Sequence, residues 1–69
     1  MEKRIFIDRF LKPLLKALDS NVASVRYMKS ANSEEYVIVT YNSGYSQNVC
    51  ITADSNKSIV TDVIGAIAL

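Results

Sequence analysis

The strongest constraint on the fold is a hairpin signal in the middle of the chain. Residues 36–41 are almost wholly β-branched or aromatic, and the polar tripeptide Asn42-Ser43-Gly44 follows them. A three-residue hairpin loop needs a type I turn followed by a residue with positive φ, and Gly44 lies at that position. The loop therefore predicts two antiparallel strands in a fixed register. The expected partners are Tyr41 with Tyr45, Val39 with Gln47, and Val37 with Val49.

This register divides the hairpin into two faces of different character. The face that we assign to the core carries Val37, Val39, Tyr41, Tyr45, Val49 and Ile51. The other face is mixed, and it holds Tyr36, Ile38, Thr40, Ser46, Asn48, Cys50 and Thr52, with Met28 added by a preceding strand. The continuous apolar run at 36–41 is typical of a central strand that is covered on both faces.

Two further elements precede the hairpin. Residues 22–29 alternate and are rich in strand formers, which predicts a first strand with Ala23, Val25 and Tyr27 on one side. Before it, residues 3–18 predict an amphipathic helix, and Pro13 within it predicts a kink or a division into two short helices. The apolar side of this helix is expected to carry Phe6, Ile7, Phe10, Leu11, Leu14, Leu15 and Leu18.

A second helix follows the hairpin, with Asp54 or Ser55 as its N-cap. Its expected buried stripe is Ile59, Val60, Val63, Ile64 and Ile67. The residues on the opposite side are small and nearly uncharged: Ser58, Thr61, Asp62 and Gly65. This side is either solvated or close enough to bare backbone for another chain to approach it. The predicted fold is α+β: helix, three-stranded antiparallel sheet, helix (αβββα), in a single small domain over residues 1–69.

The composition limits how so short a chain can be stabilised. It has 69 residues, one cysteine and no histidine, which excludes an internal disulfide and the ordinary zinc-ligand patterns. The apolar fraction of 49% is high for a domain of this size. Efficient packing and self-association remain as the ways to stabilise the domain, so we expect a homo-oligomer or another protein partner. The expected contact is the outer sheet face, at Met28, Tyr36, Ile38 and Cys50, or the last helix.

Several kinds of chemistry are disfavoured. Without histidine the chain cannot assemble a Ser-His or Cys-His nucleophile pair. Its two glycines are far apart in the sequence, so it has no glycine-rich phosphate-binding loop. Cys50 has no neighbouring cation in the sequence, so we expect a small, mostly buried and inert thiol. We therefore expect no enzyme activity, no catalytic residue, no cofactor and no metal site.

Positive charge is concentrated near the N-terminus. Residues 1–16 hold five basic and two acidic residues, while the whole chain has a net charge of +1. Arg9, Lys12 and Lys16 lie on the outer side of the predicted helix, where they are either an ordinary solvated face or candidate contacts to nucleic acid. No secretory signal stands at the N-terminus, and no apolar run approaches the roughly 18 residues that cross a bilayer. We expect a cytoplasmic protein that does not bind membranes.

The order of elements resembles the double-stranded RNA-binding domain over nearly the whole chain. That family contacts RNA through a Gly-Pro-x-His loop between its first two strands and a Lys-Lys-x-Ala-Lys cluster that opens its second helix. The corresponding stretches here read Ser30-Ala31-Asn32-Ser33-Glu34-Glu35 and Asn56-Lys57-Ser58-Ile59-Val60. The resemblance therefore implies the topology and not the RNA contacts.

A second resemblance concerns the segments at 35–41 and 51–55. They look like parts of small uncharacterised proteins carried by prophages and other mobile elements of Gram-positive bacteria, which implies an accessory role. The leading hypothesis is a non-enzymatic module for protein interaction or self-assembly. The alternative is a small nucleic-acid-binding regulator that uses the basic face of the first helix.

Overall fold

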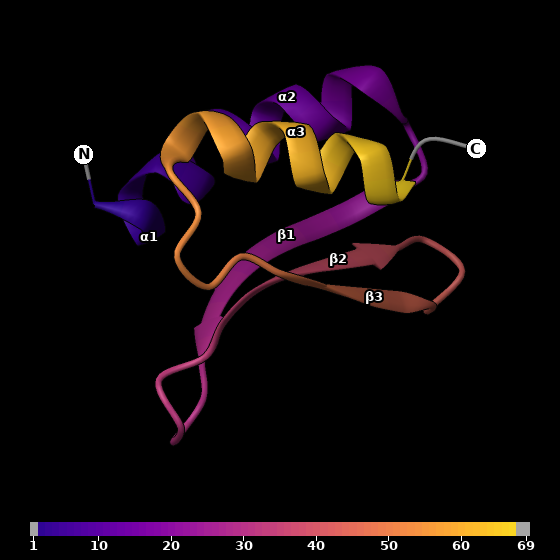
Figure 1. The fold of residues 1–69 in the computed structure, drawn as a ribbon. Coiled ribbons are helices and arrows are strands. Elements are labelled where there is room, and N and C mark those ends of the chain that lie inside the picture. Colours follow the sequence, from indigo (N-terminus) through magenta and orange to yellow (C-terminus); the bar gives the residue numbers. More distant parts are fainter. Residues whose placement is uncertain (1, 68–69) are drawn as a thin grey trace.

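The structure is a computed structural model that describes residues 2–67. It confirms the predicted α+β fold, in which helical segments and a three-stranded antiparallel sheet form two layers (Figure 1). In chain order the elements are α1 (Lys3–Phe6), η1 (Ile7–Leu11), α2 (Lys12–Leu18), β1 (Val22–Lys29), β2 (Glu35–Tyr41), β3 (Ser46–Cys50) and α3 (Asn56–Ile67).

The helices lie on one face of the sheet, whose strand order is β1-β2-β3 (Figure 1). The elements α1, η1 and α2 follow one another without a break, and we call them together the first helical segment. This segment packs on β1, and α3 packs on β3. No described element covers the other face, so the expectation that residues 36–41 are covered on both faces is wrong. The reason is topological: both connections between sheet and helix return the chain to the same side.

The hairpin has the predicted register. Val37 pairs with Val49 and Val39 pairs with Gln47. The Tyr41 N–H donates to the Tyr45 carbonyl at 2.8 Å, and Gly44 has a φ of +93°. Glycine adopts this conformation without the steric cost that a Cβ atom adds, which explains its place in the loop.

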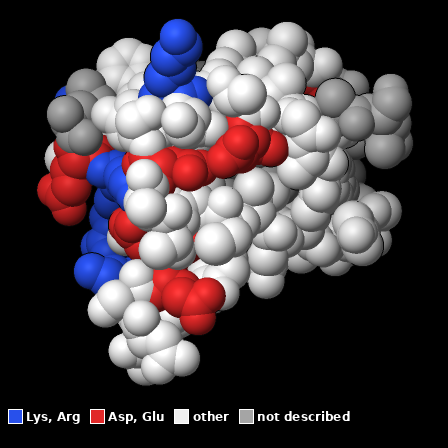
Figure 2. Space-filling view, viewed as in Figure 1, with Lys and Arg blue, Asp and Glu red and all other residues white. Residues whose placement is uncertain are grey.

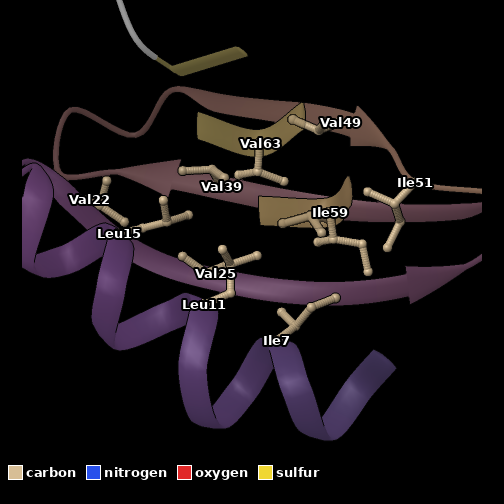
Figure 3. Packing of buried hydrophobic residues seen from close by; sticks show 11 residues of the cluster. Ile7, Leu11, Leu15, Val22, Val25, Val39, Val49, Ile51, Ile59 and Val63 are labelled. Atoms are coloured by element: carbon tan, nitrogen blue, oxygen red, sulfur yellow. The ribbon is translucent and has the colours of Figure 1, made fainter. Parts of the chain in front are cut away.

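Eleven apolar side chains form the core (Figure 3). They are Ile7, Leu11, Leu15, Val22, Val25, Val37, Val39, Val49, Ile51, Ile59 and Val63. The predicted core face of the hairpin is confirmed except at its tip, where Tyr41 is half-buried and Tyr45 is 64% exposed. Tyr45 precedes the start of β3 and stacks its ring on Tyr41 at 5.9 Å, outside the layer that the helices cover.

Pro13 is accommodated by a π-helical turn. The Lys12 N–H donates to the Ile7 carbonyl five residues earlier, and the junction residues keep right-handed helical dihedral angles. Proline lacks an N–H and its ring crowds the carbonyl four residues before it, so a wider turn ahead of Pro13 relieves the clash. The segment therefore continues through Pro13 instead of dividing into two separate helices.

The first helical segment buries a narrower stripe than predicted. Ile7, Leu11 and Leu15 are at most 1% exposed, whereas Phe10, Leu14 and Leu18 are 51%, 39% and 60% exposed. In a regular α-helix, residues four apart drift by about 40° around the axis. The wider π turn reduces this drift, so residues at four-residue steps form straight rows. One row is buried and the next is left in solvent.

β1 contains a bulge that also changes the predicted pattern. Val22 pairs with Tyr41 and Ser24 pairs with Thr40, so Ala23 is one extra residue in the strand. Val22 is buried together with Val25, while Ala23 is exposed. The prediction that Ala23 shares a side with Val25 is therefore wrong.

α3 begins as predicted with a side-chain cap. The Ser55 hydroxyl accepts a hydrogen bond from the Ser58 N–H at 3.2 Å, which selects Ser55 as the capping residue. Ile59 and Val63 are buried, whereas Val60, Ile64 and Ile67 are half-buried at the margin of the core. Among residues 2–67 no helix has the length and apolar content that a membrane span requires.

Candidate functional site

A cleft of about 500 Å³ lies between the first helical segment and β1, which is an edge strand of the sheet. Its polar lining consists of Arg4, Arg9, Lys12, Arg26, Asp8 and Tyr27, and we call it the basic cleft. It gathers four of the eight Lys and Arg residues of the chain and one of the seven Asp and Glu residues. The cleft is therefore strongly positive although the chain as a whole carries a net charge of +1.

The cations of the basic cleft are not neutralised by ion pairs. Within residues 2–67 the ion pair that forms is Lys3 with Glu35, at 2.7 Å, and Lys3 is not part of the cleft. Four cations against one acidic residue, Asp8, leave an excess of positive charge, which raises the local potential and attracts anions. The cleft thus has the electrostatics of an anion-binding surface.

A hydrogen-bonded network fixes one end of the cleft. The Tyr27 hydroxyl donates to Glu35 Oε2 at 2.6 Å, and Lys3 Nζ donates to Glu35 Oε1 at 2.7 Å. The hydrogen bond from Lys3, followed by that from Tyr27, lowers the pKa of Glu35 below its ordinary value. The same bond to Glu35 raises the pKa of Tyr27. With the Tyr27 ring held in place, the Arg4 guanidinium lies 5.4 Å from its centre in a cation–π contact.

The backbone of β1 adds hydrogen-bonding groups to the cleft. The Ser30 N–H donates to the Glu34 carbonyl, so the even-numbered residues of β1 point their backbone groups toward β2. The odd-numbered residues Val25 and Tyr27, which line the cleft, point theirs toward the open edge. Arginine side chains and backbone N–H groups therefore face the same space.

The structure brings together two of the three residues predicted to contact nucleic acid. Arg9 and Lys12 line the basic cleft, whereas Lys16 is exposed farther along α2 and does not. Sequence reasoning missed Arg4 and Arg26. Arg4 stands eight residues before Lys12. Because the π turn aligns residues at four-residue steps, this spacing places both side chains in the same row along the helix. Arg26 had no such signal, because only the packing of the helix on β1 places it there.

A second candidate surface lies on the opposite flank of the first helical segment. Phe10, Leu14 and Leu18 form an exposed row, and at its end Leu18 meets Ile64 and Ile67 in a hollow of about 210 Å³. We call this surface the apolar groove. Asp19 also lines the hollow and is its one charged residue. Figure 2, viewed as in Figure 1, shows acidic and basic side chains side by side near α1 and few charged atoms near the end of α3.

The predicted partner-binding face at Met28, Tyr36, Ile38 and Cys50 lies on the uncovered side of the sheet. Met28, Tyr36 and Cys50 form one cross-strand row, and Ile38 lies in the next row between Arg26 and Asn48. Tyr36 and Ile38 are half-buried by their neighbours, and the Tyr36 hydroxyl donates to Glu34 at 3.0 Å. The structure brings the four residues together, but polar residues interrupt their surface.

Cys50 departs from the sequence prediction in one respect. It was expected to be mostly buried, and it is exposed, with its thiol 3.6 Å from the Thr52 hydroxyl. β3 is an edge strand and Cys50 points to the uncovered face of the sheet, which explains the exposure.

One pair of carboxyl groups has altered acidity. A hydrogen bond with Asp62, together with desolvation, raises the pKa of Asp54 above its ordinary value. Two neighbouring carboxyl groups favour retention of a proton on one of them, because both cannot be charged without repulsion. Within the described part of the chain, no three His, Cys, Asp or Glu side chains are grouped so that they could hold a metal ion.

Comparisons with known proteins do not add to this geometry. A scan against protein-family models finds no match, and searches of curated proteins and of solved structures find no significant similarity. The resemblances to prophage proteins and to the double-stranded RNA-binding domain therefore stay predictions. The candidate binding surfaces are the two flanks of the first helical segment and the uncovered face of the sheet.

Proposed function

We propose that this protein is a non-enzymatic, self-assembling interaction module, and that two copies pair through the apolar groove. The observation that carries the proposal is the exposed row Phe10, Leu14 and Leu18. In a chain this short, three large apolar side chains left in solvent on one helix form a patch of the kind that marks interaction sites.

A second copy suits the groove better than a charged partner. The row repeats at four-residue steps, so two antiparallel helices related by a two-fold axis would place Leu14 against Leu14 and Phe10 against Leu18. This is the isologous contact that most homodimers use. Asp19 lies at one end of the groove, so the centre of the contact would hold no like charges face to face. Phe10 of each copy would then lie at the hollow that Leu18 and Ile64 of the other copy line.

The outer sheet face at Met28, Tyr36, Ile38 and Cys50 is the competing interface. It is less apolar than the groove because Arg26, Asn48 and Thr52 share that side of the sheet. A role as an accessory protein in the cytoplasm accords with this proposal, since the exposed Cys50 thiol has no disulfide partner in the chain.

Sedimentation equilibrium across roughly 1 to 200 µM protein tests the proposal. We expect a concentration-dependent dimer for the native chain and a monomer for Leu14→Glu. Met28→Glu on the outer sheet face is the matched control and should leave the dimer intact. Circular dichroism establishes that both variants keep the native fold.

Two results would contradict the proposal. A native chain that stays monomeric at the highest concentration would remove self-assembly altogether. Dimers that survive Leu14→Glu and dissociate with Met28→Glu would move the interface from the apolar groove to the outer sheet face.

A further inference from the structure

The basic cleft serves no purpose in the self-assembly proposed above, and its charge requires a separate explanation. Arg4, Arg9, Lys12 and Arg26 line the cleft with one acidic residue, Asp8, and form no ion pair in the described chain, so an excess of positive charge is left to repel itself. Such repulsion is unfavourable in the free protein and is relieved when an anion binds.

The arrangement of the four cations indicates an extended anion. Arg4 and Lys12 are eight residues apart along the helical segment, which corresponds to about 12 Å at the α-helical rise. Arg26 lines the same cleft from β1, although its side chain leaves the strand on the uncovered face of the sheet. Cations spread along the cleft can each contact a separate negative group of one ligand. A chain with negative charges at intervals can contact all of them.

Arg4 supplies a second feature that a polyphosphate alone does not need. Its guanidinium is held over the Tyr27 ring at 5.4 Å, and Arg4 is exposed. The guanidinium is therefore held beside an aromatic ring while it stays accessible to a ligand. Unpaired bases stack on arginine planes and on aromatic rings, whereas bases inside a duplex are already stacked on one another.

We infer that the basic cleft binds single-stranded nucleic acid, with phosphates on Arg9, Lys12 and Arg26 and a base stacked on Arg4. Backbone N–H groups at the open edge of β1 donate further hydrogen bonds to phosphate oxygens. An acidic peptide would satisfy the charges but would leave the stacking position of Arg4 unused.

Fluorescence anisotropy with a labelled mixed-sequence single strand of about 15 nucleotides tests this inference. Three phosphate contacts predict a slope of about −2 for log affinity against log salt, and hence a loss of about 20-fold between 50 and 200 mM salt. The competitors are a duplex of the same sequence, a nucleoside triphosphate and a polyglutamate peptide. We expect the unlabelled single strand to compete best.

Matched substitutions separate the cleft from general electrostatics. Lys12→Gln and Arg26→Gln should each weaken binding about fivefold and make the salt slope shallower by about 0.7. Lys16→Gln removes the same charge from the same helix outside the cleft and should change neither quantity. Arg4→Lys keeps the charge but loses the stacking plane, so affinity should fall about fivefold with an unchanged slope.

Several outcomes would overturn the inference. Undetectable binding at 50 mM salt would remove it, and equal effects of Lys12→Gln and Lys16→Gln would show that the cleft is not the site. Stronger competition by the duplex would exclude recognition of unpaired bases. Stronger competition by polyglutamate would identify an acidic protein segment as the ligand instead. Loss of self-assembly in Leu14→Glu leaves this test unaffected, so the two proposals can fail separately.

Discussion

The two flanks of the first helical segment differ sharply in the side chains that they expose. The flank toward β1 carries Arg4 and Lys12 and forms the basic cleft. The flank toward α3 carries Leu14 and Leu18 and forms the apolar groove. Between them lies the buried row that includes Leu11. Because burial requires only this one row, the same short segment has two remaining surfaces available for binding.

The two flanks also differ in the forces that would act on a ligand. Interactions in the basic cleft are electrostatic and are screened by salt. Interactions in the apolar groove depend on the area removed from water and respond little to salt. Salt and single substitutions should therefore affect the two flanks to different extents.

The largest expected effect separates the buried row from the exposed row. Leu11 is 0% exposed, so Leu11→Ala should lower the free energy of unfolding by about 2–5 kcal/mol through lost burial and a cavity. Leu14→Ala, one turn away on the exposed row, should lower it by less than about 1 kcal/mol. Urea unfolding at low micromolar concentration measures both. Equal losses would mean that Leu14 belongs to the core of the monomer and not to a surface.

A smaller effect concerns salt. Raising the salt concentration from about 50 to 500 mM should change the dimer dissociation constant by less than about twofold, because the apolar groove has few charges. Binding of the oligonucleotide should weaken strongly over the same range. Analytical ultracentrifugation at the two salt concentrations measures the dimer. Dimer dissociation with rising salt would show that charged groups, and not the row at Leu14, hold the copies together.

The smallest effect concerns the network that positions Tyr27 and Arg4. The pKa of Glu35 is lowered in the folded state, first by Lys3 and then by Tyr27. Its contribution to stability is therefore complete above the ordinary carboxyl pKa of 4.5 and is lost as the pH falls below it. In Glu35→Gln, we expect a shallower loss of thermal stability between about pH 5 and pH 3.

Glu34→Gln is the matched control for this pH dependence, because its carboxylate bonds to Tyr36 and to neither Lys3 nor Tyr27. Thermal unfolding followed by circular dichroism gives the slopes. The raised pKa of Asp54 acts in the opposite direction, since its contribution is lost as the pH rises through the folded pKa. Identical slopes for the native chain and Glu35→Gln would contradict a stabilising role of the network.

The parts of the fold that sequence predicted are those set by local chemistry. Gly44 indicated the hairpin loop, and the register that this loop sets placed Val37 and Val39 on the core face. The parts that the sequence did not predict depend on how separate helices and strands pack against one another. A bulge at Ala23 changes which residues of β1 face the core, and no residue type in that stretch predicts a bulge. Tyr45 looked like a core residue until the extent of the helical layer was known.

The candidate sites show the same division. Arg9 and Lys12 were recognisable from charge and helical spacing alone. Arg26 joined them only when β1 was placed beneath the helix. Phe10 and Leu14 were assigned to the core because an ordinary amphipathic helix has an apolar side broad enough to include them. The structure buries a narrower side, and the residues released from the core became the apolar groove.

The π turn before Pro13 has a consequence for the evolution of this chain. Deleting one residue from this turn would restore ordinary α-helical geometry and would leave Arg4 facing Tyr27 and Lys3 facing Glu35, because the turn accommodates one extra residue. Deleting one residue from α2 would instead rotate the N-terminal turn by about 100° relative to the residues that follow. Single-residue deletions should therefore be tolerated better in the π turn than in α2.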